Sequence, residues 1–241
     1  DWSSDVCSSD LVQLLATGGN VDVASGATID VSAGTGQDNG GALDATAASG
    51  TVTLAGTLKG QGGTGAIGAN LLVDAQSIDL TTIENLNSQS GFTGALALRQ
   101  RGAGDLAVTA GTTLTGTSIT LEADQGAVDI AVTLNARTVT GGQIQIGASG
   151  NITVEGSLLA DATGYATRGG QIELDTSAGG LYLNAGSLLS VGGQGGTSTG
   201  TVWLRLPADN ANTVLTAPAG TAQLQLNGTI SGAGHTVVEG Y

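Results

Sequence analysis

The sequence predicts an all-β protein that folds as a right-handed parallel β-helix. Three observations support this: an internal repeat, short alternating segments, and glycine-rich connections between them. The phrase GGQIQI at 141–146 returns as GGQIEL at 169–174, 28 positions later, and more loosely as TGTVWL at 199–204, another 30 positions on. A repeat of roughly 20–50 residues is typical of solenoids, whose units are too small to bury their own apolar faces and must stack.

The composition agrees with a lean, ordered β protein. Glycine contributes 42 of the 241 residues and aromatic residues only 2%, so the core must consist of Val, Ile, Leu and Ala. A hydrophobic content of 40% is too high for a disordered glycine-rich linker, which would lack the apolar surface to offset chain entropy.

Short segments that alternate apolar and polar residues, as half-buried strands require, follow the repeat and extend beyond it. No apolar period of 3.6 residues persists long enough to predict a helix. Besides the repeated phrases, the predicted strands are 21–23, 29–31, 52–54, 71–73, 78–80, 96–98, 106–108, 119–121, 128–130, 224–226, 229–230 and 237–238. The segments 152–159 and 181–189 echo each other and are expected to contain several short strands joined by glycine-rich corners.

Glycine clusters separate these segments, as at 18–19, 34–36, 40–41, 62–63, 179–180 and 192–193. Glycine adopts positive φ freely, so these positions suit tight corners. Three short strands and three corners form one turn of a parallel β-helix, for which a right-handed path is strongly preferred. A β-sandwich would need hairpin turns, and Asn39-Gly40 and Asn227-Gly228 are the only good candidates.

Residues 1–11 (DWSSDVCSSDL) resemble the translation of a sequencing adapter, so we exclude them from the fold. They contain Cys7, the only cysteine, and Trp2, to which we assign no role. We expect residues 12–241 to form a single β-helical repeat region that is truncated at both ends.

The formal net charge is −14, and the six Lys and Arg residues form no basic stripe. Nucleic acids and anionic membranes attract clustered positive charge, so neither is an expected partner. No apolar run approaches the roughly 20 residues that cross a bilayer, so we expect no membrane insertion.

Three phrases resemble the shaft of filamentous haemagglutinin-like large exoproteins: GGNVDVASGATIDVSAG at 18–34, GGQIQIGASGNITVEGSL at 141–158, and GTISGAGHTVVEGY at 228–241, with VWLRLP at 202–207 before the last. The resemblance implies a right-handed β-helical fibre of a Gram-negative adhesin. It also implies a secreted or cell-surface location, reached through the outer-membrane transporter barrel of a two-partner secretion system. The expected function is that of a structural shaft, with host or bacterial surface glycans or proteins as partners.

The main alternative is a carbohydrate-active β-helical enzyme, either a polysaccharide lyase or a hydrolase. Such an enzyme needs carboxylates clustered with a base or a cation on one outer face. The pairs Asp22 with Asp30 and Asp124 with Asp129 fit a solvated face better. Lys59 has no carboxylate near it along the chain. His235, the only histidine, is expected to lie at the surface. We therefore expect no catalytic residue and no enzymatic activity.

A calcium-binding β-roll is the third interpretation, because Gly-Gly-x-Gly-x-Asp repeats build such rolls. The segments 62–67 and 192–197 begin correctly but lack the aspartate, and 34–39 supplies Asp38 only once. Because a calcium array needs tandem copies, we expect neither a metal nor a cofactor.

Two aromatic residues are candidate surface contacts, Trp203 and Tyr165. With Val202 and Leu204 facing inward, Trp203 should point outward. The polar segment 207–213 would then either fold over the ring or leave it exposed as a platform for a sugar or a protein partner.

Overall fold

The computed structural model describes residues 10–34, 36–86, 90–109, 113–164, 168–194, 199–207 and 224–240. The chain divides into two compact units. One comprises residues 1–101 with 114–116, and the other residues 102–113 with 117–241. Each unit is described by itself.

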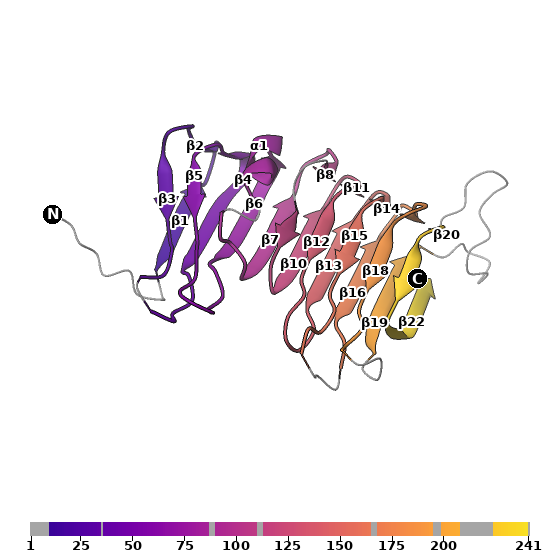
Figure 1. Cartoon of the computed structure of the whole chain (residues 1–241). Helices are drawn as coiled ribbons and strands as arrows, with labels where there is room; N and C mark the ends of the chain where they lie inside the picture. Colours follow the sequence, from indigo (N-terminus) through magenta and orange to yellow (C-terminus); the bar gives the residue numbers. More distant parts are fainter. Residues whose placement is uncertain are drawn as a thin grey trace. The chain divides into compact units, whose positions relative to one another are not determined.

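The second unit is built from short strands that return to the same three parallel sheets on every turn of the chain (Figure 1). The first sheet contains β10 (Ser118–Ala123), β13 (Gln143–Ala148), β16 (Gln171–Thr176), β19 (Gly200–Leu206) and β22 (Ala233–Gly240). The second contains β8 (Leu106–Val108), β11 (Val128–Ile130), β14 (Ile152–Val154), β17 (Leu181–Leu183) and β20 (Leu224–Leu226). The third contains β12 (Thr133–Asn135), β15 (Ser157–Leu159), β18 (Leu188–Ser190) and β21 (Thr229–Ser231).

The predicted parallel β-helix is thereby confirmed. Every strand pairs in parallel with the equivalent strand one coil away, and the repeated phrases are the residues in register: Ile144 pairs with Ile172, and Ile172 with Val202. Successive coils differ in length, from 25 residues between Ser118 and Gln143 to 34 between Val202 and Thr236. The Asn-Gly pair at 227–228 connects β20 to β21, which lie in different sheets, so it forms no hairpin.

Aliphatic columns fill the inside of this unit. Leu121, Ile146, Leu174 and Leu204 occupy one register position on four successive strands, and all four are fully buried. A second column consists of Ile119, Ile144, Ile172 and Val202. Period-2 alternation places one side chain of each pair inside and the next outside, which is why polar residues occupy the intervening positions.

The first unit uses longer strands. It contains β1 (Leu11–Ala16), β2 (Val21–Val23), β3 (Thr28–Asp30), β4 (Ala42–Leu54), β5 (Thr57–Lys59), β6 (Asn70–Ile78), the helix α1 (Leu80–Asn85), β7 (Ala95–Gln100) and β9 (Leu114–Thr115). The parallel order β1-β4-β6-β7 forms its main sheet, β2 also pairs with β4, and β3 pairs with β5. Leu11 begins β1, and the carbonyl of Asp10 accepts a hydrogen bond from the amide of Ala42.

The helix α1 shows that two predictions were wrong. One was the strand at 78–80, and the other was that the chain contains no helix. Asp79 caps it by accepting a hydrogen bond from the amide of Thr81 at 2.9 Å, which ends the strand at Ile78. Side chains of the helix then bond the backbone of β4 where a further strand would have paired. Thr82 accepts from the amide of Leu54 and donates to the carbonyl of Val52, while Asn85 donates to the carbonyl of Leu54.

At the glycine clusters predicted as corners, most of the described glycines act through close approach and not through the predicted positive φ, although Gly141, which opens the first repeated phrase, has a φ of 93°. Of the described glycines in the predicted corners, only Gly19 has a positive φ, at 148°. The repeated phrases show the other role, since Gly142, Gly170 and Gly200 lie in equivalent places. A Cβ on any of them would overlap a backbone carbonyl, that of Ala136 for Gly142. Glycine here lets the chain that leaves a corner pack closely against the chain that enters it.

Candidate functional site

Outward side chains of β16, β19 and β22 form three transverse rows on the first sheet of the second unit. One row contains Gln171, Thr201 and His235, the next Glu173, Trp203 and Val237, and the third Asp175, Arg205 and Glu239. As predicted, Trp203 points outward and is half-buried, while its neighbours Val202 and Leu204 are fully buried. Whether Trp203 contacts a ligand stays a prediction. Tyr165 and residues 208–213 lie outside the described residues.

Arg205 is the centre of an ion-pair group beside Trp203. Its guanidinium lies 5.9 Å from the centre of the indole ring, within the range of a cation–π contact. It donates to Glu173 on one neighbouring coil and to Glu239 on the other, the latter at 2.8 Å. The hydrogen bond to Glu239, followed by the charge of Glu173, raises the pKa of Arg205 above its ordinary value. This group therefore joins three coils.

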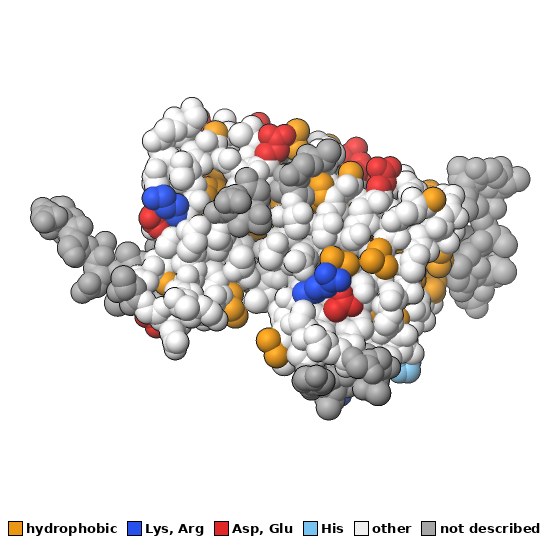
Figure 2. Space-filling model, viewed as in Figure 1, with side chains coloured by type: hydrophobic (Ala, Val, Ile, Leu, Met, Phe, Trp, Pro, Cys, Tyr) orange, Lys and Arg blue, Asp and Glu red, His pale blue; other side chains and the backbone are white. Residues whose placement is uncertain are grey.

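The same arrangement recurs on both units, and cations on the face in Figure 2 lie beside carboxylates. Lys59 lies 3.6 Å from Asp30, Arg101 bonds Asp74, and Arg137 bonds Asp161 at 2.9 Å. Each partner is one coil away, 29 positions along the chain for Asp30 and Lys59. Lys59 therefore has a carboxylate neighbour in space, although none lies near it in the sequence.

Asparagine side chains at strand ends add a second type of bond between coils. The side-chain oxygen of Asn70 accepts from the amide of Ala95 at 2.7 Å, and that of Asn151 accepts from the amide of Gly180 at 2.9 Å. Asn20 and Asn39 do the same for Thr51 and Ile67. Each of these bonds satisfies a backbone amide of the neighbouring coil.

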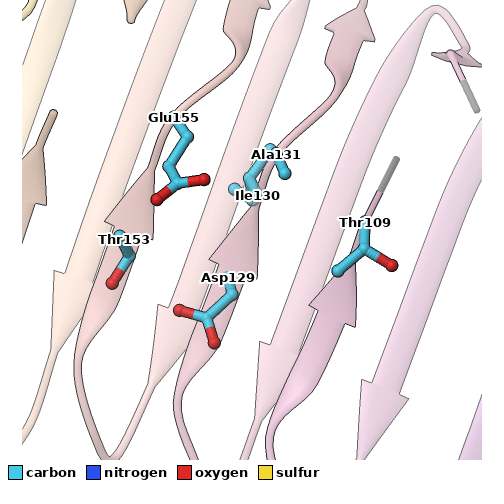
Figure 3. Close-up of a pocket in the computed structure, with 6 residues that line it drawn as sticks. All are labelled: Thr109, Asp129, Ile130, Ala131, Thr153 and Glu155. Atoms are coloured by element: carbon cyan, nitrogen blue, oxygen red, sulfur yellow. The ribbon is translucent and has the colours of Figure 1, made fainter. Parts of the chain in front are cut away.

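The second sheet carries the clearest candidate for chemistry, a surface pocket of about 290 Å³ with two carboxylates. Figure 3 shows Asp129 in the middle of β11 and Glu155 just after β14, on neighbouring coils, and both line the same pocket. The remaining lining residues are Thr109, Ile130, Ala131 and Thr153. Asn184 from the next coil donates to Glu155 at 3.2 Å.

This pocket pairs Asp129 with Glu155, whereas the sequence suggested Asp124 as the neighbour of Asp129. Asp124 does not line it. Glu155 could have been found by aligning the coils, because Asp129 pairs with Thr153 and Glu155 comes two residues later. Asp22 and Asp30 pair instead with Thr53 and Lys59.

The pocket offers acceptors for sugar hydroxyls but a limited set of groups for catalysis. Asp129 and Glu155 supply carboxylates, and Thr109 and Thr153 supply hydroxyls. No Lys, Arg or His is among the residues that line it. A lyase needs a base together with a cation that stabilises the developing charge, and this lining contributes only the first.

In the part of the chain that the structure describes, no three His, Cys, Asp or Glu side chains gather as a metal site would require. Within those same residues, no helix has the length and apolar character needed to cross a bilayer. Comparisons with protein-family models, curated proteins and solved structures find no match.

Proposed function

We propose that this chain is a structural shaft segment of a secreted bacterial surface adhesin. Its role is mechanical: it holds a binding region away from the cell and carries out no chemistry of its own. One observation carries the proposal. Fully buried aliphatic columns run through successive coils, while the outer polar residues bond each coil to the next.

Such a unit resists extension without needing a ligand. Each coil contacts only its neighbours, so load passes through ladder hydrogen bonds, the aliphatic columns and ion pairs such as Arg205 with Glu173 and Glu239. The resemblance of 18–34, 141–158 and 228–241 to filamentous haemagglutinin-like exoproteins supplies the adhesin context. Export through an outer-membrane transporter barrel, a cell-surface location, and contacts with surface glycans or proteins are part of the same proposal.

Single-molecule force spectroscopy on the full chain tests the mechanical role. Since each coil contains 25–34 residues in the second unit, unfolding one coil at a time releases about 80–120 Å of chain per step. A shaft predicts a series of such steps at high force. A single low-force event for each unit would contradict the proposal, because it would indicate ordinary globular cooperativity.

A carbohydrate-active enzyme is the second candidate, and the pocket with Asp129 and Glu155 is the observation that favours it. The test is to incubate the chain with a panel of polysaccharides and to measure new reducing ends and the ultraviolet absorbance of unsaturated products. Turnover that is abolished in Asp129→Asn or Glu155→Gln, with the thermal melt unchanged, would replace the shaft proposal with the enzyme. Turnover equal to that of a heat-inactivated sample supports the shaft.

A further inference from the structure

Arg168 differs from the paired cations of this chain. Lys59, Arg101, Arg137 and Arg205 each contact a carboxylate one coil away. Arg168 is exposed and forms no ion pair with any residue that the structure describes. In a chain with a net charge of −14, a cation that has no ion pair among the described residues is a local exception.

Arg168 lines a surface pocket of about 410 Å³, which lies within the roughly 300–1,000 Å³ typical of small-molecule sites. The lining contains no carboxylate. Besides Arg168, its side chains come from Gln171, Thr199, Thr201 and His235, and Gly169, Gly170 and Gly200 contribute backbone. It therefore combines one guanidinium with an imidazole, an amide and two hydroxyls.

The polar side chains of this pocket, not its backbone, are available to a ligand. The amides of Gly169, Gly170, Gly200 and Thr201 all donate to carbonyls of neighbouring coils. Gln171, Thr201 and His235 form one outward row across three successive coils, so their side chains emerge side by side. The adjacent rows carry Glu173, Asp175 and Glu239, which share the single cation Arg205.

We propose that this pocket binds the carboxylate of a polyhydroxylated organic acid such as a sugar acid. The guanidinium of Arg168 recognises a planar carboxylate through two parallel hydrogen bonds. Gln171, Thr199, Thr201 and His235 donate to and accept from the ligand hydroxyls. Trp203 lies two residues beyond Thr201 on the same outer face of β19 and reports on occupancy through its fluorescence. The site does not depend on the shaft proposal, since no step of it requires a mechanical role.

Titration of the full chain with sodium D-glucuronate at constant ionic strength tests this site. Trp2→Phe removes the other tryptophan, so that Trp203 alone is followed. We expect a saturable change, and Arg168→Gln should weaken binding roughly tenfold or more, as loss of a hydrogen bond to a charged group does. The affinity of Arg168→Lys for glucuronate should lie between that of the parent chain and that of Arg168→Gln, because lysine keeps the charge but loses the bidentate geometry.

Arg137→Gln is the matched control, because it removes a cation of the same unit that Asp161 already pairs. It should leave glucuronate binding unchanged within about twofold. Thermal melts of all variants check that the unit remains folded. Glucose tests the role of the carboxylate, and acetate and sulfate test the role of the hydroxyls.

Binding of glucuronate that exceeds binding of glucose, acetate and sulfate, and that requires Arg168, supports the proposal. It is overturned if glucuronate gives no saturable change, or if Arg168→Gln binds as tightly as the parent chain. Equal binding of glucose overturns the role of the charge, and equal binding of acetate or sulfate overturns recognition of a polyhydroxylated acid.

Discussion

Arg205 on β19 donates a hydrogen bond to Glu173 on β16, and the carboxylate side chain of Glu173 is only 12% exposed. The two residues occupy neighbouring rows on adjacent coils, with Trp203 directly beside Glu173 in register. A carboxylate so well covered needs a partner, because burying an unpaired charge is costly.

Removing the guanidinium should therefore destabilise the second unit through Glu173. Arg205→Gln is expected to lower the melting temperature by about 2–6 °C. Arg137→Gln, which opens a more exposed pair, should lower it by less. In the double variant Arg205→Gln with Glu173→Gln, the buried charge is gone and stability should partly return. A double variant less stable than Arg205→Gln alone would contradict this role for Glu173.

The aliphatic columns should dominate stability. Ile146→Ala removes a fully buried side chain between Leu121 and Leu174, and we expect a loss of about 2–5 kcal/mol in the free energy of unfolding. Gln145→Ala on the outer face of the same strand should change it by no more than about 0.5 kcal/mol. Urea denaturation measures both, and similar losses for the two variants would argue against an inward column.

Close approach of the backbone across a corner explains the second glycine of the repeated phrases, and a matched pair of variants tests it. Gly142→Ala places a methyl group on the carbonyl of Ala136 and should cost about 1–3 kcal/mol. Gly147→Ala meets only the side chain of Glu122, at 3.7 Å, and should be neutral or stabilising by up to about 1 kcal/mol. If Gly142→Ala and Gly147→Ala have the same melting temperature, close approach does not explain the glycine of the phrase.

The pair of Asp30 and Lys59 predicts a small dependence of stability on pH. Burial raises the pKa of Asp30, but hydrogen bonds from Ser32 and the charge of Lys59 outweigh it, so the pKa lies below the ordinary 3.8. The carboxylate therefore stabilises the fold above this ordinary value, and the contribution disappears as pH falls through the folded value.

Because both side chains are 49% exposed, solvent screens the pair and the contribution is about 0–1 kcal/mol. Urea denaturation of the parent chain and of Asp30→Asn, from pH 7 to pH 3, should show a difference that shrinks toward the acid end. A difference that grows on acidification would have the wrong sign.

Period-2 alternation was enough to predict most strands, because one buried aliphatic residue on each side of a polar one is a local pattern. Segments 106–108, 128–130 and 224–226 coincide with strands of the structure. The helix at Leu80–Asn85 was not predicted because six residues are too few to show a 3.6-residue period. Its only sequence signal is the cap at Asp79.

The candidate sites were harder to predict, since their residues meet only through the register of the coils. Asp30 and Lys59 are 29 positions apart, and Asp129 and Glu155 line one pocket from adjacent coils. Arg168 and His235 belong to different turns of the chain, separated by a coil of yet another length. Without the register, alternation predicts that a side chain faces outward but not which side chain of the next coil lies beside it.

The most direct test of the central claim is a far-UV circular dichroism spectrum and a thermal melt of the full chain, first with calcium and then with excess chelator. A shaft that its aliphatic columns and inter-coil bonds hold together predicts a β spectrum and a melting temperature that does not change on chelation. A melting temperature that collapses on chelation would contradict it and would make the corners calcium sites. A helical spectrum would contradict the fold itself.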